Sequence, residues 1–345
     1  MPETSPSAAR PRRIAPLGIG SALPEAVVTS AEIEQRLGLA PDWLVSRTHI
    51  KQRHILGEGE RITDFALRAS ERALADAGID GGEVDLVIAA CLISDDIAPS
   101  MAAVVSSRIG DGHAASFDIS TGCSGFVAAV TTATAMIESG RFRTVLVVAA
   151  EAMSRLTNRS DKATAGLLGD GAGAIVLRGM DDDGVGRVGP SVMGSDGASG
   201  GTVRIATEHP SVFDDGEFGE GIPYALQMNG FDTYKVAVQH FEQTVRETAA
   251  ADGVALEDLD LIVLHQANGR ILEAVRKRFG LPEERMASSV ANHGNTSAAS
   301  IALALADARA EGRVVPGTRL LLAGFGSGLA WAGITMTWEG SANGR

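Results

Sequence analysis

Short apolar runs bounded by Gly or Asp alternate along this chain with longer stretches of helical period. The short runs predict strands and the longer stretches predict helices. The predicted strands are Ile14–Gly20, Leu86–Ala90, Ala115–Ile119, Val145–Ala149, Ala174–Leu177, Leu261–Leu264, Met286–Ser288, Arg319–Ala323 and Gly333–Thr337. The predicted helices are Thr63–Ala77, Met101–Ile109, Ser124–Ser139, Phe231–Ala251, Ile271–Phe279 and Ser297–Ala310. This alternation indicates an α/β protein with mostly parallel central strands, in sheets covered on both faces.

The same order of elements occurs twice. A predicted helix that ends near Gly78 leads to an apolar strand, and a predicted helix that ends near Gly253 does the same in the second half. Later in each half a Gly-X turn, at Cys123 and at Asn295, precedes a helix of small residues and a further apolar strand. Two copies of a βαβ unit related by pseudo-symmetry would bring these helix starts together. We therefore expect the active site between Cys123 and Asn295.

The predicted domain organisation follows from this repeat. Residues 1–13 are rich in Pro, Ser, Ala and Arg and lack the apolar segment of a secretory signal, so we expect a disordered tail. Residues 14–180 make the first half and residues 181–345 the second. The stretch Asp181–Phe218 is rich in Gly and Asp with little helical period. It indicates the junction of the halves, followed by a loop-and-hairpin excursion.

Composition narrows the possible functions. Of the 345 residues, 45% are hydrophobic and 4% aromatic, so a large core has to be built from Ala, Val, Leu and Ile. The net charge of −13 argues against nucleic acid and anionic membrane as partners, and no apolar run is long enough to span a bilayer. With Cys91 and Cys123 as the only cysteines, no disulfide framework is expected, and a cytoplasmic setting is the default. There is no zinc-ligand spacing, so we expect no metal site.

Cys123 lies between two glycines where a predicted strand gives way to a predicted helix. A thiol at a helix N-terminus feels the positive end of the macrodipole and unpaired amide N–H groups. Both lower the thiol pKa and favour the nucleophilic thiolate. A buried structural cysteine is the alternative interpretation. Cys91 has no such setting, and we assign it to the core.

Polar residues end the apolar strand Leu261–Leu264, beginning with His265. Active sites of α/β folds gather at the carboxyl ends of strands, although a core histidine satisfied by one hydrogen bond is the alternative. Asn295 has its own alternative, ordinary turn and capping chemistry. Together, Cys123, His265 and Asn295 combine a nucleophile with polar donors aimed at a thioester carbonyl. The set indicates acyl transfer.

Two glycine-rich strings have opposite interpretations. Gly169–Ala174 resembles a phosphate-cradling loop, but a strand follows it where a nucleotide site needs a helix. We therefore reject a nucleotide site there. Gly324–Leu329 holds the corresponding place in the second half, where tight glycine turns could leave backbone N–H groups free to bind an oxyanion.

These motifs resemble those of β-ketoacyl-acyl carrier protein synthase III, the initiating condensing enzyme of the thiolase superfamily. The resemblance runs from about Ile14 to the C-terminus. Its motifs are the Cys123 turn, His265–Asn268, Gly294–Ser300, Gly169–Ala174, Gly324–Leu329, and Pro41–Thr48 followed by Arg53 and His54. It implies a thiolase-like fold in which two pseudo-symmetric βαβ halves form a five-layer αβαβα sandwich. It also implies a homodimer that pairs its central sheets across a two-fold axis.

The resemblance assigns Cys123 as the acyl-accepting nucleophile and His265 and Asn295 as the pair that assists decarboxylation. An acyl-CoA would acylate Cys123. A malonyl thioester on acyl carrier protein would then lose CO₂ and attack the acyl-cysteine, giving a β-ketoacyl thioester. The backbone N–H groups of Cys123 and Ser327 would hold the tetrahedral oxyanion. No cofactor is expected beyond these two substrates, acyl-CoA and malonyl-acyl carrier protein.

CoA and the phosphopantetheine of the carrier protein would share one tunnel. The residues that match CoA or pantetheine contacts are Trp43, Arg47, Lys162 and Asn268, where Lys162 replaces an arginine that is frequent in the family. Arg270 and Lys235 match cations at the tunnel mouth that attract the acidic carrier protein. Ordinary solvated charge is the alternative interpretation of Lys235.

Three positions depart from the family pattern. Gly122 replaces the usual alanine, which would loosen the turn before the nucleophile, and Ser327 interrupts a usual run of three glycines. Ala98 stands where members selective for acetyl groups often carry a bulky aromatic residue, on a segment that reaches the neighbouring subunit's acyl pocket. Because Ala98 leaves space there, we expect primers larger than acetyl. Phe325 is assigned to the same acyl pocket.

The leading interpretation is a decarboxylative condensing enzyme that initiates fatty acid or secondary-metabolite synthesis. The alternative is an acyltransferase that moves the acyl group from Cys123 to another acceptor without decarboxylation, although such relatives often vary the His or Asn. A third is a non-catalytic partner subunit of a polyketide system, which usually lacks the nucleophile. A thiolase would need a second cysteine near the terminal glycine turn, and a hydroxymethylglutaryl-CoA synthase would need a glutamate base; we identify neither motif.

Overall fold

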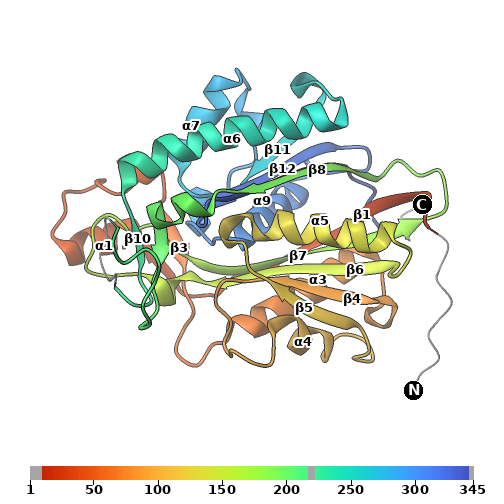
Figure 1. The fold of residues 1–345 in the computed structure, drawn as a ribbon, viewed down its shortest axis with the longest axis horizontal. Helices are drawn as coiled ribbons and strands as arrows, with labels where there is room; N and C mark the ends of the chain where they lie inside the picture. The colour runs from red at the N-terminus through yellow and green to blue at the C-terminus, as the bar shows by residue number, and fades with distance from the viewer. Residues whose placement is uncertain (1–9, 217–221, 342–345) are drawn as a thin grey trace.

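Two main β-sheets run through the protein, and helices separate and cover them (Figure 1). The structure is a computed structural model that describes residues 10–216 and 222–341. The first sheet has the strand order β1-β7-β6-β4-β5, with β1 (Arg13–Ala22), β4 (Leu86–Ala90), β5 (Ala115–Ile119), β6 (Thr144–Ala152) and β7 (Asp170–Met180). The second has the order β11-β12-β13-β8, with β8 (Arg187–Ser195), β11 (Leu261–Leu264), β12 (Arg319–Gly326) and β13 (Ala330–Thr337). Two small sheets pair β2 (Val27–Thr29) with β3 (Gln52–His54) and β9 (Val203–Ile205) with β10 (Leu226–Met228).

Helices form three layers around the two main sheets. The helices of these layers are α3 (Ile62–Ala77), α4 (Met101–Ser106), α5 (Gly125–Glu138), α6 (Gly230–Asp252), α7 (Gly269–Arg278) and α9 (Ala299–Ala310). α3 and α4 cover the first sheet, α5 and α9 lie between the sheets, and α6 and α7 lie on the outer side of the second (Figure 1). Three shorter helices are α1 (Ser30–Leu37), α2 (Val45–Thr48) and α8 (Val290–His293). The predicted five-layer αβαβα sandwich is confirmed.

The predicted internal repeat is visible in the strand order. The series β1-β7-β6-β4 of the first sheet corresponds to β8-β13-β12-β11 of the second, and α5 corresponds to α9. α3 and α6 correspond as well, and each ends at a glycine in the left-handed region, Gly78 with φ 65° and Gly253 with φ 67°. Such a residue lets the chain leave the helix and return to the sheet. The two halves therefore use the same local chemistry to build the same layers.

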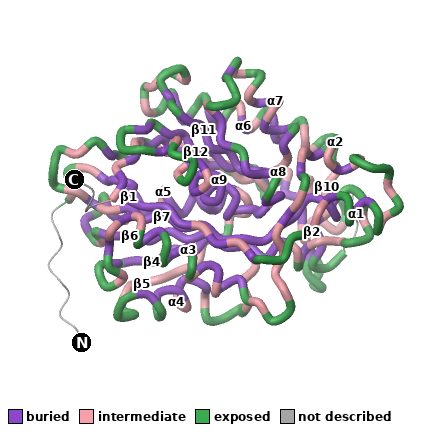
Figure 2. Tube along the Cα trace, turned by 180° about the vertical axis from the view of Figure 1, so that it is seen from behind, coloured by how far each residue is buried: buried purple, intermediate pink, exposed green. Residues whose placement is uncertain are grey.

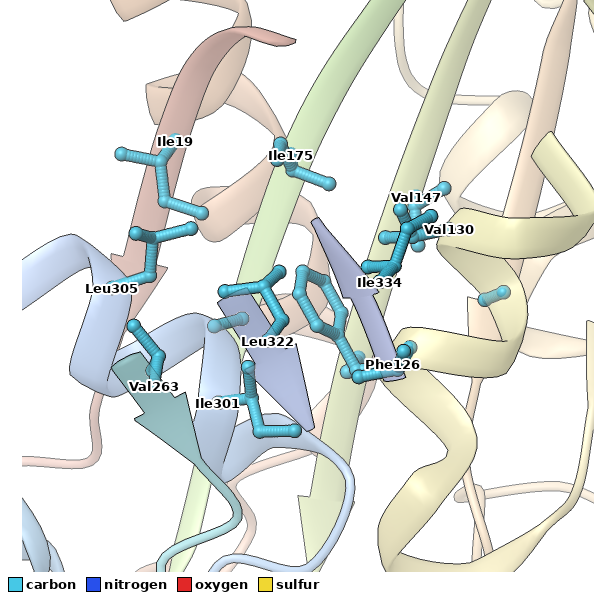
Figure 3. Packing of buried hydrophobic residues seen from close by; sticks show 14 of the residues in the cluster. Ile19, Phe126, Val130, Val147, Ile175, Val263, Ile301, Leu305, Leu322 and Ile334 are labelled. Carbon is cyan, nitrogen blue, oxygen red and sulfur yellow. The ribbon is translucent and has the colours of Figure 1, made fainter. Parts of the chain in front are cut away.

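Aliphatic side chains fill the space between the sheets. α9 is apolar on nearly all sides, as expected for a helix enclosed by two sheets, and Ile301 and Leu305 on it are fully buried. Figure 3 shows these two side chains with Ile175 of the first sheet and Leu322 of the second in one cluster. Gly173 lets β7 approach α9, because a Cβ there would lie 2.5 Å from a methyl group of the helix. Figure 2 shows the buried residues concentrated along these central elements.

The prediction of mostly parallel strands holds for strand direction with two exceptions, because β7 and β13 run against the other strands of their sheets. β4 is parallel to β5 and β6, and β11 is parallel to β12. β7 is antiparallel to both β1 and β6, and β13 is antiparallel to both β12 and β8. Two parallel neighbours that follow one another in the chain need a long crossover connection, usually a helix. β6 and β12 are instead followed directly by the strand beside them, so the pairing reverses.

The predicted strand Met286–Ser288 is also wrong, because it forms one isolated bridge between Met286 and Ile262. The Gln266 side chain occupies the hydrogen-bonding positions that a longer ladder would use. Its Nε2 donates to the carbonyls of Leu264 and Ala287, at 2.7 and 3.4 Å, and its Oε1 accepts the N–H of Ser289 at 2.9 Å. The first sheet therefore has a fifth strand, β5, with no full counterpart in the second.

The stretch Asp181–Phe218 contains a strand that its composition does not reveal. β8 forms the edge of the second sheet and includes Pro190, which edge strands tolerate. The predicted hairpin exists only in part, since β9 pairs with β10, which lies beyond the stretch. Phe218 itself lies outside the described residues. The helix predicted at Met101–Ile109 ends at Ser106.

Arg12 and Arg13, which the sequence places in the predicted disordered tail, are part of the fold. Residues 1–9 lie outside the described part of the chain, but Arg13 begins β1 and the Arg12 N–H donates to the Met180 carbonyl at 3.0 Å. Arg13 is also hydrogen-bonded to Glu339 at the other end of the chain. Across residues 10–216 and 222–341, no helix combines the length and the apolar character required to cross a membrane.

Candidate active site

A cavity of about 400 Å³ opens between the two halves, and its lining is mainly apolar. Cys123, His265 and Asn295 all line it. They come from three separate places in the chain: the turn before α5, the end of β11 and the turn before α9. The structure thus brings together the three residues that the sequence singles out. Ser327 and Phe325 line the same cavity.

Cys123 lies in a 3₁₀ turn, Gly122–Ser124, between β5 and α5. The glycine turn of the second half packs directly against it, because a Cβ at Gly326 would lie 2.7 Å from the Cβ of Cys123. The cysteine Sγ is 3.7 Å from the Ser297 Oγ. Ser297 has a φ of 49°, a strained conformation for a residue with a side chain. The backbone around Asn295 therefore holds this hydroxyl beside the thiol.

The expectation that the helix start lowers the pKa of the Cys123 thiol is wrong. Removal from water raises the pKa of Cys123 to about 12, and the hydrogen bond between the thiol and the Ser297 hydroxyl is the largest opposing effect. Burial penalises the charged thiolate more than the neighbouring donors stabilise it. The thiol is therefore protonated at neutral pH. An attack on a thioester requires a group that takes its proton.

His265 follows β11 and is buried, with 1% of its surface exposed. Its Nδ1 lies 2.7 Å from the Ser300 Oγ, which also accepts the Gln266 N–H at 3.1 Å. Ser300 then has its own hydrogen to donate to Nδ1, and this arrangement favours the tautomer with the hydrogen on Nε2. Burial lowers the pKa of His265 to about 3, opposed by the Ser297 carbonyl. The ring is neutral at physiological pH.

Asn295 is held by backbone pairing with the first half. Its N–H donates to the Leu167 carbonyl at 2.9 Å and its carbonyl accepts the Gly169 N–H at 3.0 Å. Its Oδ1 accepts the Ser297 N–H at 2.9 Å, which leaves the amide Nδ2 for a ligand in the cavity. Gly169 cannot carry a side chain, since a Cβ there would lie 2.3 Å from the His293 carbonyl oxygen.

This pairing gives the string Gly169–Ala174 a structural role. No helix follows it, as predicted; Asp170 is the first residue of β7, so all of the string except Gly169 belongs to that strand. The Asp170 carboxylate is buried and accepts N–H groups of Leu56 and Ser154, at 2.8 and 2.7 Å. The string therefore fixes the loop that supports Asn295.

Of the four residues predicted to bind CoA, two line the cavity. Arg47 and Asn268 line it, and the Asn268 Nδ2 donates to the Arg47 carbonyl at 3.3 Å. Trp43 lies beside Arg47, whose guanidinium carbon is 4.2 Å from the centre of the indole ring. Trp43 and Lys162 are not among the lining residues, and Lys162 is exposed.

Of the residues predicted to contact the carrier protein or the acyl chain, some line the cavity and others do not. Arg270 lines the cavity and is exposed. Lys235 does not line it, but its Nζ is 4.0 Å from the ring centre of Phe231, which does. Ala98 is exposed and lies outside the cavity of its own chain. Its assignment to an acyl pocket requires a second subunit and stays a prediction.

Two functional candidates were not predicted from the sequence. Ser297 stands inside a recognised motif, but its hydroxyl had no assigned role. Glu151 is fully buried at the end of β6. A carboxylate in an otherwise apolar strand is the sequence signal that could have identified it, because buried carboxylates are rare unless they are paired or functional.

Gly122 and Ser327, two departures from the family pattern, fit one another. Gly122 has a φ of 55°, and a Cβ built on it would lie 2.7 Å from the Ser327 Oγ. The serine hydroxyl therefore occupies space that an alanine at 122 would need. The expected loosening of the turn stays a prediction.

An αβαβα sandwich whose two halves bring a cysteine, a histidine and an asparagine into one apolar cavity defines the class of thiolase-like condensing enzymes. The comparisons with known proteins specify the family. Residues 117–197 match the family described as 3-oxoacyl-[acyl-carrier-protein (ACP)] synthase III, and residues 249–338 match its C-terminal part. The chain belongs to the β-ketoacyl-[acyl-carrier-protein] synthase III family.

Similar proteins cover almost the whole chain. The β-ketoacyl-[acyl-carrier-protein] synthase III of Rhodobacter capsulatus is 39% identical over 322 residues, which are 93% of this chain and 98% of the relative. That of Xanthomonas campestris is 40% identical over 314 residues, 91% of this chain and 95% of the relative. The crystal structure of the Thermus thermophilus synthase III has a TM-score of 0.86 at 38% identity, with 94% and 99% of the two chains covered. The priming β-ketosynthase of the R1128 polyketide pathway has a TM-score of 0.86 at 33% identity, with 97% and 99% covered.

The contact between positions 122 and 327 predicts a measurable coupling. Gly122→Ala alone should lower the free energy of unfolding by about 1–3 kcal/mol, through backbone strain and the clash with Ser327. Adding Ser327→Gly should recover part of this loss, with a coupling of about 1 kcal/mol in a double-mutant cycle measured by urea unfolding.

Gly312 provides the matched control for this cycle. It also has a positive φ, 75°, but open space surrounds its Cβ position. Gly312→Ala and Ser327→Gly should therefore be additive within about 0.5 kcal/mol. If the effects of Gly122→Ala and Ser327→Gly on the free energy of unfolding were also additive, the two positions would be independent.

Proposed function

We propose that the protein is a decarboxylative condensing enzyme that uses an acyl-CoA primer and malonyl-acyl carrier protein. The product is a β-ketoacyl-acyl carrier protein that begins a fatty acid or secondary-metabolite chain. The observation that carries the proposal is the meeting of Cys123, His265 and Asn295 in one apolar cavity. The reaction uses no cofactor besides its substrates. Two free cysteines fit a reducing cytoplasm as its setting.

In the first step the primer acylates Cys123. The Sγ attacks the thioester carbonyl carbon, and the bond from that carbon to the CoA sulfur breaks. The backbone N–H groups of Cys123 and Ser327 hold the oxyanion, which the close packing of Gly326 on Cys123 supports. Losing one such donor typically costs about 3–4 kcal/mol of barrier.

In the second step malonyl-acyl carrier protein loses CO₂, and the resulting enolate attacks the acyl-cysteine. The Nε2–H of His265 and the Nδ2 of Asn295 donate hydrogen bonds to the enolate oxygen as its charge develops. A neutral histidine suits this role, because the low pKa of His265 prevents it from protonating and trapping the enolate. The apolar cavity strengthens both hydrogen bonds, since little water competes with them.

Cations at the mouth of the cavity serve recognition of the two anionic substrates. Arg47 and Asn268 meet CoA or pantetheine inside the cavity, and Trp43, which stacks beside Arg47, and Lys162 are proposed to contact the outer part of CoA. Arg270 and Lys235 attract the acidic carrier protein, although the net charge of this protein is −13. Local positive charge is needed to overcome that repulsion.

A homodimer is also part of the proposal. β5 is the edge strand of the first sheet, and its residues are only partly buried although Phe117 and Ile119 are apolar. An uncovered apolar edge strand is suited to pair with a second copy. Nearby in sequence, the Ile97 side chain is fully exposed, on the segment that carries Ala98. A partner would cover this segment and receive Ala98 at its acyl pocket.

The proposed reaction predicts different losses for the three site residues. Cys123→Ala should show no acylation in intact-protein mass spectra after incubation with acyl-CoA. His265→Ala and Asn295→Ala should still be acylated but should discharge the acyl group to malonyl-acyl carrier protein at least about 10²-fold more slowly. CO₂ release and product formation are measured in parallel.

Two outcomes would contradict the condensation. An acylated wild-type protein that malonyl-acyl carrier protein cannot discharge would indicate acyl transfer to another acceptor. Absence of acylation with every acyl-CoA would indicate a non-catalytic subunit.

The primer prediction is tested with a series of acyl-CoAs. Wild-type protein should be acylated by butyryl-CoA and longer or branched primers at least as fast as by acetyl-CoA. Ala98→Phe should slow the larger primers and leave acetyl-CoA nearly unchanged, because the new ring fills only the far end of the pocket. A strong wild-type preference for acetyl-CoA would contradict this assignment.

The dimer prediction is tested by size-exclusion chromatography with light scattering. The wild-type mass should be twice the 35.7 kDa of one chain. Ile97→Asp should shift the equilibrium toward monomer, because an interface would bury the new charge. Val212→Asp, at another exposed position, should have no effect. A monomeric wild-type protein would contradict the proposed dimer and the proposed role of Ala98 in the partner's acyl pocket.

A further inference from the structure

Glu151 is a buried carboxylate behind the nucleophile that the proposed reaction does not yet use. It lies near the end of β6 with none of its surface exposed. Its Oε2 accepts the Leu92 N–H at 3.0 Å, whereas its Oε1 has no hydrogen-bond partner that meets normal geometry within the described structure. The Ser297 hydroxyl and the backbone N–H groups of Ala298 and Ile93 also lower the pKa of Glu151, but burial outweighs them. A carboxylate held in a buried site at this cost points to a function.

Ser297 stands between this carboxylate and the nucleophile. Its hydroxyl is 3.7 Å from the Cys123 Sγ, and it also lowers the pKa of Glu151 as a hydrogen-bonding neighbour. The strained φ of 49° fixes its position, and the Asn295 Oδ1 holds its N–H. One hydroxyl therefore faces both the thiol and the carboxylate.

Resting on the proposed function, we propose that Glu151 takes the proton of Cys123 through the Ser297 hydroxyl during acylation. As Sγ forms its bond to the thioester carbonyl carbon, the thiol hydrogen passes to the Ser297 Oγ and the serine hydrogen passes to Glu151. When the carbon–sulfur bond to CoA breaks, the departing thiolate takes a proton back through Ser297. Cys123 ends acylated, CoA leaves as a thiol, and Glu151 is ionised again.

The protonation states of the surrounding groups support this role. Burial raises the pKa of Glu151 to about 7, near the working pH and thus suited to accepting and returning a proton. His265 is a poor alternative, because its pKa is about 3 and its Nε2 carries a hydrogen in the favoured tautomer. The titratable groups close to Glu151 are the thiols of Cys123 and Cys91, and the charge of Glu151 raises the pKa of each. Asp118 lies beyond Cys91, 3.7 Å from its sulfur.

The same proximity allows a competing role with the opposite consequence. If Glu151 only repelled the negative charge of the thiolate, removing its charge would lower the thiol pKa and make Cys123 more reactive. If Glu151 accepts the proton, removing it makes Cys123 less reactive. Glu151→Gln separates the two, because glutamine has nearly the same shape and can still accept the Leu92 N–H.

The test is the single-turnover acylation of Cys123 by p-nitrophenyl acetate, an activated ester that needs no CoA recognition and no malonyl substrate. The rate is followed by released p-nitrophenolate and by intact mass from about pH 5 to about pH 9, with Cys123→Ala as the blank. In wild-type protein the rate should rise with a midpoint near the Glu151 pKa of about 7. Glu151→Gln and Ser297→Ala should lose this rise and acylate about 10²-fold more slowly at pH 8.

Controls distinguish a proton relay from structural damage. Glu151→Asp should keep a pH-dependent rise, since it retains an ionisable group. Acyl-enzyme prepared by long incubation of Glu151→Gln should be discharged by malonyl-acyl carrier protein at close to the wild-type rate, because decarboxylation depends on His265 and Asn295. Equal or faster acylation in Glu151→Gln, or an unchanged pH profile, would overturn the proposal. Failure of discharge in every variant, including wild type, would instead count against the condensation.

Discussion

The site depends on one short backbone pairing between the halves. The two peptide hydrogen bonds that join Asn295 to Leu167 and Gly169 attach the second half to the first. Because the pairing fixes the backbone on both sides of Asn295, it sets the position of the Asn295 amide and of the Ser297 hydroxyl together. Both of these groups face Cys123 or its substrate. A displacement of this pairing would move the asparagine, the serine and the cysteine relative to one another, so it sets the geometry of the whole cavity.

Burial decides the chemistry of the groups held in that geometry. The same apolar surroundings keep the Cys123 thiol protonated and the His265 ring neutral. They also raise the pKa of Glu151 to about 7. Water would give these groups quite different charges. An enclosed cavity is thus a source of hydrogen-bond donors for an enolate, but it works against formation of the nucleophile. The reaction therefore needs a group that accepts the proton of Cys123.

The sequence predicted the layers and the three site residues because both follow from local patterns. Apolar runs set the strands, and repeated glycine turns mark the positions of Cys123 and Asn295. Strand direction was not predictable in the same way, since it depends on which neighbour each strand meets. β8 was missed because an edge strand has only one buried partner and tolerates Gly and Pro.

The protonation states of the site residues could not be predicted from the sequence for a related reason. The expected low pKa of Cys123 rested on a helix start, which a sequence reveals. The raised pKa rests on burial, which depends on residues distant in the chain. Glu151 shows the same limit, because its neighbour Ser297 is 146 positions away (297 − 151). Only folding places the carboxylate behind the nucleophile.

The fit between Gly122 and Ser327 also constrains the history of this site. In an ancestor with the usual alanine at 122, a serine at 327 would have met a methyl group in the space its hydroxyl now occupies. Glycine at 122 is compatible with either glycine or serine at 327. The order of substitutions that avoids a clash is therefore glycine at 122 first and serine at 327 second. Once the serine is present, a return to alanine at 122 is obstructed. The present Ser327 therefore makes position 122 less tolerant of a side chain than it would be beside a glycine.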